Sequence, residues 1–583
     1  MFLATTALQE FWDSSQELLC LGSWCLRHDQ RTAWEGLRRR ILPCPWDDRE
    51  RFYRAAQDLD AFGEQLLPRL AEYLNAAHGV SQSVAYWRVL IGPWLLHYLH
   101  AVYDRYVHLT DALARHPDVT TIVMDPTSYR VPADLAETVK YLGADAYNLQ
   151  LYSQLLQEMG HRFPAKPYAG PWVLAENGGA TKDRPPARHA AKRAFTAGVW
   201  AAQRLQGARW RAALHDLDCS DALLIPLMRR SRWRVLPAAI RESWGWAAPG
   251  PVWDRRRLGL QALPAAGEFE RLAVRLLPQH VPTLYLEGYQ AAAAAAEHDR
   301  PAVPVLVSAA AWYFDEPFKF AAAAARQAGT RLIAAQHGGG YGLFRWMPFE
   351  QHERRVADAY LAWGWADHQP AIRNLPAPKL SSWLTQGPPQ SPGAILFIAT
   401  CHARYLYRFH SAPVGSQWPE YIHWQLRFLR RLPEALRASL LFRPYAHDYG
   451  QGLRAQITEA FPALQWDGGA PIRSRLRGSR VVVIDHVGTT LLETLALNIP
   501  TILFWNPNRW EVRTEAAADM DGLRGAGILH HTPEDAAAAA TRAYEDSAWW
   551  SSRSVQDARR GFVERHALAR TDWPDVWAEA LSA

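Results

Sequence analysis

The order of hydrophobic and polar positions along the chain predicts two separate series of alternating strands and helices. Apolar runs of strand length alternate with helical segments in residues 281–342, and the same alternation returns in residues 394–505. Strands separated by helical segments of about 10–15 residues form βαβ units, whose strands lie parallel in one sheet. We therefore predict an α/β protein with two doubly wound, Rossmann-like domains that face a cleft.

Short apolar runs mark the individual strands. The strands expected in the first series are residues 281–288, 303–310 and 331–340, and those in the second are 394–400, 439–445, 481–485 and 501–505. Further strands are expected upstream, at residues 18–25 and 119–126. Alanine-rich helical segments separate the strands of the first series, as expected for the residue with the highest helix propensity.

Two long segments upstream of the first series have helical spacing. Residues 49–79 are periodic, and Gly79 stands where a helix would stop. Residues 83–109 are strongly apolar but contain Arg88 and Pro93, so they predict a buried core helix more than one that lies on a membrane. No run of about 18 uncharged apolar residues occurs, which predicts no transmembrane helix.

A stretch rich in Pro, Ser and Gly at residues 372–393 is the expected domain boundary. We predict an N-terminal domain at 1–385, a C-terminal domain at 386–545 and a helical tail at 546–583 that packs back on either domain. The N-terminal domain is expected to carry a helical insertion at about 49–115 and a basic, weakly patterned one at about 180–245.

Composition restricts the class of protein. Hydrophobic residues make up 49% and charged residues 21% of the 583 residues, with a mean hydropathy of −0.25, as is usual for soluble folded proteins. The five cysteines are scattered without a CxxC pair, which argues against a zinc site or a disulfide framework and fits a reducing cytosol. The N-terminus carries acidic residues early and does not resemble a signal peptide.

The chain is basic, with a net charge of +6 and a pI near 9.0. The excess gathers between Lys182 and Arg241. A solvated face explains it, or an anionic partner such as a nucleotide, a lipid diphosphate or the inner membrane leaflet. No nucleic-acid module is visible, so we expect no nucleic-acid partner. The 27 tryptophans also suit a protein that packs aromatic rings on sugars.

The clearest candidate site is the turn that follows the strand at 481–485. Free N–H groups at the start of the next helix bind anions, and Gly488 lets a phosphate approach closely. The alternative is a capping box, in which Thr490 and Glu493 satisfy the same N–H groups without a ligand. The candidate donor-binding residues here are Asp485, His486, Gly488, Thr489, Thr490 and Glu493.

A second candidate is the glycine-rich loop after the strand at 331–335. It contains Gln336, His337, Gly338, Gly339 and Gly340. Such a loop brings bare backbone against a ligand and leaves the histidine at the edge of the cleft; the alternative is a flexible turn. It is neither a Walker A loop nor a GxGxxG fingerprint.

Three further clusters hold charged or aromatic residues. Arg443, with His447 nearby, follows a strand and suits a diphosphate or a carboxylate, unless it forms a surface ion pair. Asp315 or Glu316 is a candidate general base for an acceptor hydroxyl, unless both only compensate a helix dipole. The remaining candidates line the cleft from the N-terminal side: Trp24 and Arg27, with Asp47 and Asp48. No motif requires a metal, and no cofactor is expected.

With these motifs, the sequence resembles a family of transferases encoded among bacterial surface-polysaccharide and O-antigen genes. The segments that carry the resemblance are FLATTALQEFWD, LGSWCLR, PWDDRE, YWRVLIGPWL, AAQHGGGYG, FRPYAHDYG and TTLLETLALNIPTI, which extend from the N-terminus to about residue 507. More remotely the chain resembles GT-B glycosyltransferases, particularly those that use CMP-activated acidic sugars, and CDP-glycerol polymerases.

The resemblance implies a GT-B-like fold whose C-terminal domain holds the nucleotide. It implies phosphate contacts from Gly488, Thr489 and Thr490 and a ribose contact from Glu493. The first acid of the paired-acid spacing is an aspartate on the strand, Asp485, and the His-Pro pair of the sialyl- and CDP-glycerol-type enzymes is not matched.

These observations lead to one main hypothesis and three alternatives. The main one is a cytoplasmic, metal-independent glycosyltransferase that moves a sugar, in particular an acidic nonulosonate- or Kdo-like one, from a CMP-sugar in preference to a UDP-sugar. The acceptor would be a glycan or lipid-linked glycan of a surface polysaccharide, with peripheral contact to the inner membrane. Arg443 would bind the phosphate or sugar carboxylate, and His337, Asp315 or Glu316 would take the acceptor proton. The alternatives are a UDP-sugar 2-epimerase, a CDP-glycerol-type phosphotransferase and a non-catalytic glycan-assembly scaffold.

Overall fold

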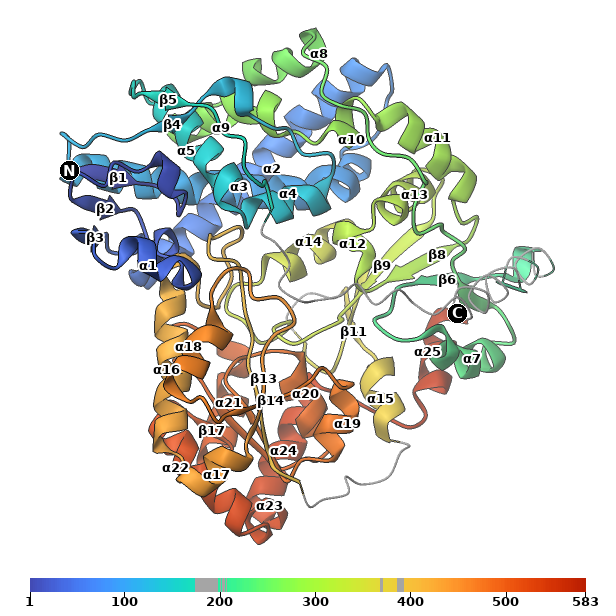
Figure 1. The fold of residues 1–583 in the computed structure, drawn as a ribbon. Coiled ribbons are helices and arrows are strands. Elements are labelled where there is room, and N and C mark those ends of the chain that lie inside the picture. The colour runs from blue at the N-terminus through green and yellow to red at the C-terminus, as the bar shows by residue number, and fades with distance from the viewer. Residues whose placement is uncertain are drawn as a thin grey trace.

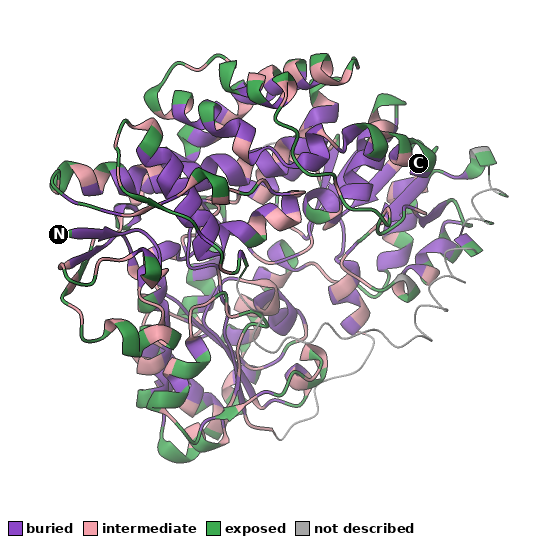
Figure 2. Cartoon of the chain, turned by 45° about the horizontal axis from the view of Figure 1, so that its top comes forward, coloured by how far each residue is buried: buried purple, intermediate pink, exposed green. Residues whose placement is uncertain are grey.

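The computed structural model describes residues 1–173, 198–199, 201, 205, 207–366, 371–384 and 393–582. The chain forms two lobes, each built around a six-stranded parallel sheet (Figure 1). Helices cover the sheets, and the strands and inner helices of both lobes are buried while the outer helix faces are exposed (Figure 2). The predicted α/β class with two doubly wound, Rossmann-like domains is confirmed.

The second lobe has the strand order of a dinucleotide-binding fold. Its strands are β12 (Ile395–Ile398), β13 (Leu441–Arg443), β14 (Gln465–Trp466), β15 (Val481–Ile484), β16 (Thr501–Phe504) and β17 (Leu529–His530). They lie parallel in the order β14-β13-β12-β15-β16-β17. In chain order this is 3-2-1-4-5-6, so the topology reverses between β12 and β15, where such sheets bind ligands beyond their carboxyl ends.

The sheet of the first lobe reverses at a different place. Its strands are β6 (Ala212–His215), β7 (Val235–Pro237), β8 (Val305–Ser308), β9 (Arg331–Ala335), β10 (Ala359–Ala362) and β11 (Ile372–Asn374). The order is β11-β10-β9-β8-β6-β7, with all pairs parallel and the reversal between β6 and β8. In such sheets ligands bind beyond the carboxyl ends of the strands at the reversal.

The structure contradicts the prediction that residues 180–245 form an insertion, because β6 and β7 of the sheet lie within this range. β6 lies inside the sheet, paired with β7 on one side and β8 on the other. The two strands have four and three residues, too short for a visible alternation, and arginines precede both. Residues 180–197 of the expected insertion lie outside the described residues.

One of the expected strands is also wrong. Residues 283–286, within the predicted strand at 281–288, form the helix α10 (Thr283–Leu286), which leads into α11 (Tyr289–Asp299). All four residues of α10 are buried. A short apolar run that is buried on every side has no periodicity that separates a strand from a helix.

The two predicted long helices are present and start at side-chain caps. The Asp48 carboxylate accepts from Arg51 N at the start of α2 (Arg49–His78), and Ser83 Oγ accepts from Tyr86 N at the start of α3 (Val84–Arg115). α2 ends at Gly79, whose φ of 67° favours glycine. α3 packs against α2 and against α13 (Glu316–Gln327) in the core of the first lobe, as the sequence predicts. Within the described chain, no helix is long and apolar enough to cross a membrane.

The N-terminus adds a small parallel sheet beside these helices. Its strands are β1 (Phe2–Ala4), β2 (Leu18–Cys20) and β3 (Arg39–Ile41), in that order. At the other end of the chain, α25 (Trp573–Ser582) returns to the first lobe and packs against α7 (Asp221–Arg230) (Figure 1). Trp577 Nε1 donates to Pro376 O at 2.9 Å, which fixes this last helix to the segment between the lobes.

A loop of the second lobe, residues 399–414, reaches across into the first (Figure 1). Arg404 donates to the Asp145 carboxylate at 2.5 Å and to Trp24 O at 2.6 Å, and Tyr405 OH donates to Asp145 at 2.6 Å. Both members of the ion pair are buried, with side chains 3% and 6% exposed. The loop thus connects the lobes through a buried charge pair.

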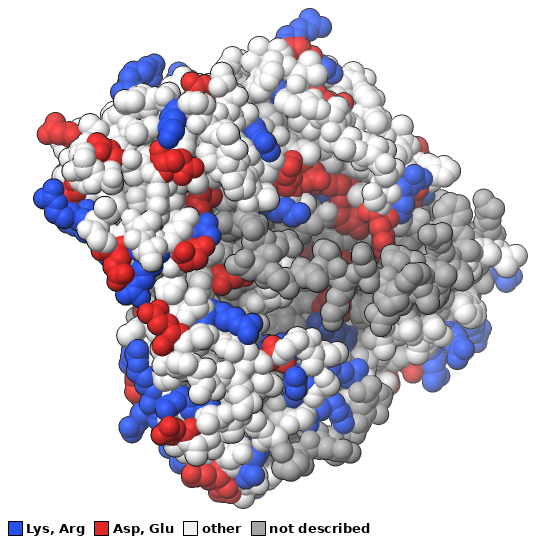
Figure 3. Space-filling model, viewed as in Figure 1, with Lys and Arg blue, Asp and Glu red and all other residues white. Residues whose placement is uncertain are grey.

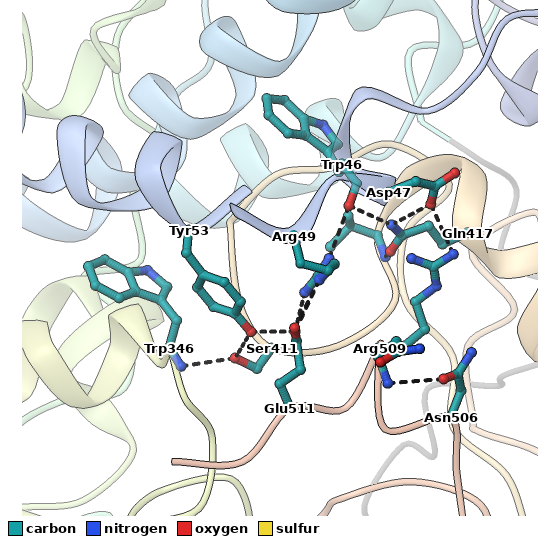
Figure 4. A network of polar contacts seen from close by, with 12 residues as sticks. Trp46, Asp47, Arg49, Tyr53, Trp346, Ser411, Gln417, Asn506, Arg509 and Glu511 are labelled. Atoms are coloured by element: carbon teal, nitrogen blue, oxygen red, sulfur yellow. Dashed lines mark hydrogen bonds and ion pairs between the residues drawn. The ribbon is translucent and has the colours of Figure 1, made fainter. Parts of the chain in front are cut away.

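A polar network connects the lobes at a second place (Figure 4). Arg49 Nε lies 3.1 Å from the Glu511 carboxylate, which also accepts from Tyr53 OH. Ser411 Oγ lies 3.0 Å from the same hydroxyl and accepts from the backbone N–H of Trp346 at 2.9 Å. These contacts set the relative position of the two lobes on one side of the cleft.

Candidate functional site

A cleft of about 740 Å³ lies between the lobes. Its lining comes mainly from the carboxyl ends of β12, β13 and β15, the strands at and next to the reversal of the second sheet, together with Gly339, Phe344, Met347 and Lys379 from the other side. Toward the space between the lobes, acidic side chains gather on the first-lobe side and basic ones on the second-lobe side (Figure 3). This charge distribution suits an anionic ligand on the second lobe.

The turn after β15 faces this cleft. Val487, Gly488, Thr489 and Thr490 all line it, and Gly488 is the N-cap of α20 (Thr489–Ala496). The N-cap is Gly488 and not Thr490, so the capping box between Thr490 and Glu493 is not formed. The N–H groups of the first turn of α20 therefore lie at the cleft without a side-chain cap, where the helix dipole favours negative charge.

The glycine-rich loop of the first lobe meets this turn directly. Gly339 N donates to Thr489 Oγ1 at 3.0 Å, and a Cβ added to Gly339 would lie 2.1 Å from the carbonyl carbon of Gly488. Gly338 lies against Thr489 as well, since its Cβ would be 3.0 Å from the hydroxyl oxygen. Gly340 has a φ of 97°, which favours glycine. Backbone contact between the lobes accounts for glycine at position 339.

Gln336 holds the loop in place. Its side-chain oxygen accepts from Trp363 N at 2.9 Å and from Trp365 Nε1 at 2.8 Å, and its Nε2 donates to Gly338 O at 3.0 Å. The side chain is buried and so acts on the backbone rather than on a ligand.

His337 lies at the same strand end with its ring about a quarter exposed, at 23%. Nε2 is 3.2 Å from Tyr341 OH, and Nδ1 makes no hydrogen bond within the described chain. Burial lowers the pKa of His337 to about 4, although the negative charge of Asp218 acts in the opposite direction. The ring is therefore neutral at pH 7 and able to accept a proton.

The two acidic candidates after β8 have different surroundings. Asp315 is the N-cap of α13, accepting from Phe318 N at 2.9 Å, and its other oxygen lies 2.9 Å from His215 Nε2. Glu316 is buried, with its carboxylate 2.8 Å from Lys319 Nζ and 2.7 Å from Tyr285 OH, and burial raises its pKa. Glu316 as a base that contacts an acceptor is therefore wrong, because its carboxylate is enclosed in the core.

Arg443 lines the cleft but is already paired. Its Nη1 donates to the Asp467 carboxylate at 2.5 Å and to Ala470 O at 2.8 Å. His447 is exposed and lies outside the cleft lining, beside the rings of Tyr445 and Tyr449. Of these two candidates, only Arg443 lies at the cleft, and its Nη1 already donates hydrogen bonds within the protein.

Asp485 stands behind the cleft and not in it. Its oxygens accept from Tyr421 OH at 2.8 Å and from Gln425 Nε2 at 2.6 Å, and His486 Nδ1 lies 3.0 Å from the first of them. The carboxylate is 2% exposed, whereas His486 lines the cleft. Asp485 thus orients His486 and is not available to a ligand, which corrects its assignment as a donor-binding residue.

The N-terminal candidates also lie away from the cleft. Trp24 is buried, with Nε1 donating to Thr5 O at 3.0 Å, and Arg27 pairs with Asp29. Asp47 and Asp48 serve in the contact between the lobes and as the cap of α2, respectively. Lining of the cleft by Trp24 and Arg27 is therefore wrong, because these residues support the loop that joins the lobes.

Comparison with known proteins places the chain in a family. The family model described as "LIC12162 family transferase" matches residues 1–581. The chain belongs to this family of transferases. The predicted resemblance to a transferase family is thereby confirmed, and no curated protein matches the chain.

Three solved structures are similar to this LIC12162 family member over 64% of its length. Spinosyn forosaminyltransferase SpnP shares 11% identity, is covered over 100% of its chain and has a TM-score of 0.30. The α,α-trehalose-phosphate synthase (UDP-forming) from Burkholderia vietnamiensis shares 12%, is covered over 99% and has a TM-score of 0.32. WaaG, a glycosyltransferase involved in lipopolysaccharide biosynthesis, shares 11%, is covered over 99% and has a TM-score of 0.27.

The structure also places residues in the cleft of this LIC12162 family member that sequence analysis missed. Lys379 Nζ lies 3.2 Å from the Glu493 carboxylate and 3.0 Å from that of Asp218, so it connects the two lobes. Burial lowers the pKa of Lys379, but the two carboxylates outweigh this and raise it; burial raises the pKa of Glu493. Glu493, which was expected to bind the ribose, is therefore already ion-paired with Lys379.

The loop after β12 supplies the other missed residues. His402, Arg408 and His410 all line the cleft. The segment CHARYLYRFH follows a predicted strand and carries two histidines and two arginines, a signal that was available in the sequence. Among the described residues, no group of three or more His, Cys, Asp or Glu side chains is arranged to hold a metal ion.

Proposed function

We propose that this transferase is a glycosyltransferase of the GT-B type, which binds a nucleotide-sugar donor on the second lobe and a glycan acceptor on the first. The observation that carries the proposal is the uncapped start of α20, which opens into the cleft at the reversal of a 3-2-1-4-5-6 sheet. This is the position at which such sheets bind phosphate groups. The glycine loop of the other lobe, in contact with the same turn, brings the acceptor side next to the donor.

The donor phosphate would accept from the N–H groups of the first turn of α20 beside Gly488. Thr489 and Thr490 are half-buried there and add hydroxyl groups. Backbone N–H groups and a helix dipole are fixed before the reaction, so they stabilise charge on the leaving nucleotide without reorganisation and without a metal ion. A cytidine monophosphate donor, preferred over a UDP-sugar, needs only one such phosphate site.

The acceptor would be a glycan or a lipid-linked glycan of a surface polysaccharide, with its reacting hydroxyl on the first-lobe side. His337 is the leading base because it is neutral at pH 7 and a quarter exposed. Asp315, paired with His215, is the second candidate. Removal of the proton and departure of the nucleotide would take place on opposite sides of the sugar, between the two lobes.

Substitutions of Thr490 test the donor site with little risk to the fold. A glutamate at this position stabilises the helix, because it is an acid in the first turn, but it repels a phosphate. We expect Thr490→Glu to weaken nucleotide binding by about tenfold or more, equivalent to about 1.4 kcal/mol, while the Tm is unchanged or slightly higher. Thr490→Gln, which has the shape of glutamate without its charge, is the matched control and is expected to weaken binding less than Thr490→Glu.

The same measurement tests the nucleotide. We expect CMP at about tenfold above its Kd to raise the Tm by about 1 °C, and UMP to raise it less. A larger shift with UMP or UDP moves the donor to the uridine class. If no nucleotide raises the Tm, or if Thr490→Glu binds as well as the wild type, the proposal fails.

We further propose that the protein acts in the cytoplasm and contacts the inner membrane through the end of α7. Arg229, Arg232, Trp233 and Arg234 are exposed, and the three arginines form no ion pair within the described chain. Trp233 is 41% exposed and has a φ of 63°, which is unusual for a residue with a bulky side chain. Lys and Arg gather over α7 (Figure 3). Arginine attracts anionic lipid, and tryptophan prefers the membrane interface.

Vesicle sedimentation tests this surface. Wild-type protein is expected to bind phosphatidylglycerol vesicles more strongly than phosphatidylcholine vesicles. A variant with Arg229, Arg232 and Arg234 replaced by serine is expected to lose this preference, since each basic residue contributes about 1 kcal/mol. Equal binding of the variant would contradict the assignment of the surface.

A further inference from the structure

Arg408 is a cleft-lining cation that lacks a carboxylate partner. No acidic side chain of the described residues lies within ion-pair distance of it, and its buried Nε makes no hydrogen bond there. Arg443, the arginine that the sequence favours, is paired with Asp467 instead. A guanidinium cannot lose its charge in a protein, so an unpaired one at a binding cleft is a ligand site more readily than a structural group.

Aromatic side chains hold the guanidinium group in place. Its central carbon lies 4.1 Å from the ring centroid of Phe349 and 5.2 Å from that of Tyr407. Stacking on a ring fixes the plane of the group while its edge remains able to donate hydrogen bonds. Arg408 is therefore preorganised for a flat oxyanion, which a carboxylate is and a phosphate is not.

Two histidines beside Arg408 form a hydrogen-bonded pair. His410 Nδ1 lies 3.2 Å from Arg408 O, and His410 Nε2 lies 3.1 Å from His402 Nδ1. Burial and the Arg408 charge lower the pKa of His402 to about 3 and that of His410 well below its usual value, so both rings are uncharged at pH 7.

The direction of these hydrogen bonds follows from chemistry. A carbonyl oxygen only accepts, so His410 Nδ1 must carry the proton and its Nε2 must accept. His402 Nδ1 then donates, which leaves His402 Nε2 as an acceptor on a ring that lines the cleft. The loop after β12 thus offers a cationic donor and a neutral acceptor at the cleft, on a different loop from the turn that begins α20.

We propose that Arg408 and His402 form a subsite for the carboxylate of an acidic donor sugar. Arg408 donates to the carboxylate, and His402 Nε2 accepts from a neighbouring hydroxyl of the sugar. The assignment rests on the proposed glycosyltransferase function and specifies its substrate class as an acidic sugar carried by a nucleotide. The same oxyanion chemistry would suit the second phosphate of a nucleoside diphosphate, and the experiment separates the two sources.

Calorimetric titration with four probes tests the subsite: CMP, CMP-N-acetylneuraminate, UDP-glucose and UDP-glucuronate. The two sugar acids carry the carboxylate, whereas CMP and UDP-glucose do not. We expect Arg408→Gln to weaken the binding of CMP-N-acetylneuraminate by about 10- to 100-fold, as charged hydrogen bonds are lost. CMP is expected to change by less than about threefold, within the usual effect of a distant substitution.

Two further variants keep the outcome interpretable. Arg345→Gln removes another ring-stacked arginine, 3.9 Å from the Tyr53 ring centroid and outside the cleft lining, and is expected to leave all four probes unchanged. Arg408→Lys keeps the charge but not the planar fork and is expected to lose less than Arg408→Gln. It serves as the test if the glutamine variant does not fold.

Each other result overturns the inference. An equal loss for CMP and CMP-N-acetylneuraminate makes Arg408 a ligand of the nucleotide, and an equal loss for UDP-glucose and UDP-glucuronate makes it a ligand of the second phosphate. If Arg408→Gln binds both sugar acids as well as the wild type does, the subsite proposal is wrong, while the proposed function stands. If the wild type binds none of the four probes, the proposed function fails and the subsite fails with it.

Discussion

Replacing Gly339 by alanine is expected to reduce sugar transfer by on the order of 100-fold, because misplacement by about 1 Å costs that much. The added Cβ would lie 2.1 Å from the carbonyl carbon and 2.3 Å from the carbonyl oxygen of Gly488, and 2.6 Å from the N–H nitrogen of Thr489. All three are backbone atoms, so no side-chain rotation relieves the contact. The lobes must separate, and the acceptor side moves away from the donor.

Transfer of label from the best-bound nucleotide sugar to acceptors in a membrane extract measures this effect. Nucleotide binding, measured in parallel, shows how much of this loss arises at the turn beside Gly488, against which the added Cβ would lie. Gly36→Ala is the control, since its Cβ would meet nothing within 4 Å. Full transfer by Gly339→Ala would show that turnover does not use this contact between the lobes.

Replacing Asp145 by alanine is expected to destabilise the protein by about 3–5 kcal/mol, because it leaves the Arg404 charge buried and unpaired. Arg404 and Tyr405 OH lose their shared acceptor, and so does the N–H of Ala7 at 3.2 Å. Urea-induced unfolding measures the loss. Asp29→Ala, which removes an exposed partner of Arg27, is the matched control and should cost at most about 1 kcal/mol.

The same pair predicts a pH dependence. Burial raises the pKa of Asp145, but the Arg404 guanidinium and the Tyr405 hydroxyl outweigh burial and lower it. A carboxyl whose pKa is lower in the folded state contributes stability above its unfolded pKa of about 4 and loses it as the pH falls through the folded pKa. The difference in stability between wild type and Asp145→Ala should be constant from pH 7 to pH 5 and narrow below about pH 4.

A double substitution separates charge from packing. Asp145→Leu combined with Arg404→Met replaces the ion pair with apolar groups and should be less destabilising than Asp145→Ala alone. If the double variant loses as much stability as the two single variants together, the destabilisation does not come from an unpaired charge.

Local sequence signals were sufficient for the parallel sheets and for the turn at the start of α20. The apolar run Val481–Ile484 is completely buried, so its strand signal is strong, and Gly488 marks the following turn. The four-residue strand β6 had no comparable signal, and β7 ends in a proline that argues against a central strand. The position of β6 depends on pairing with β8, far along the chain, and that of β7 on pairing with β6.

The site was predictable only where it is local. Gly488, Thr489 and Thr490 follow a strand directly, and the structure places them in the cleft. Whether an acid or an arginine is free, however, depends on partners distant in sequence: Glu316 is enclosed by Tyr285, and Arg443 is paired with Asp467. Lys379 acquires its position between Asp218 and Glu493 from the way the two lobes meet, which no spacing along the chain reveals.

The most direct measurement is a crystal structure of the protein with the nucleotide that raises its Tm most. The account predicts that a phosphate oxygen lies within about 3 Å of an N–H group of the first turn of α20, beside Gly488 in the cleft. A phosphate bound elsewhere, for example beyond β6 and β8 in the first lobe, would contradict it.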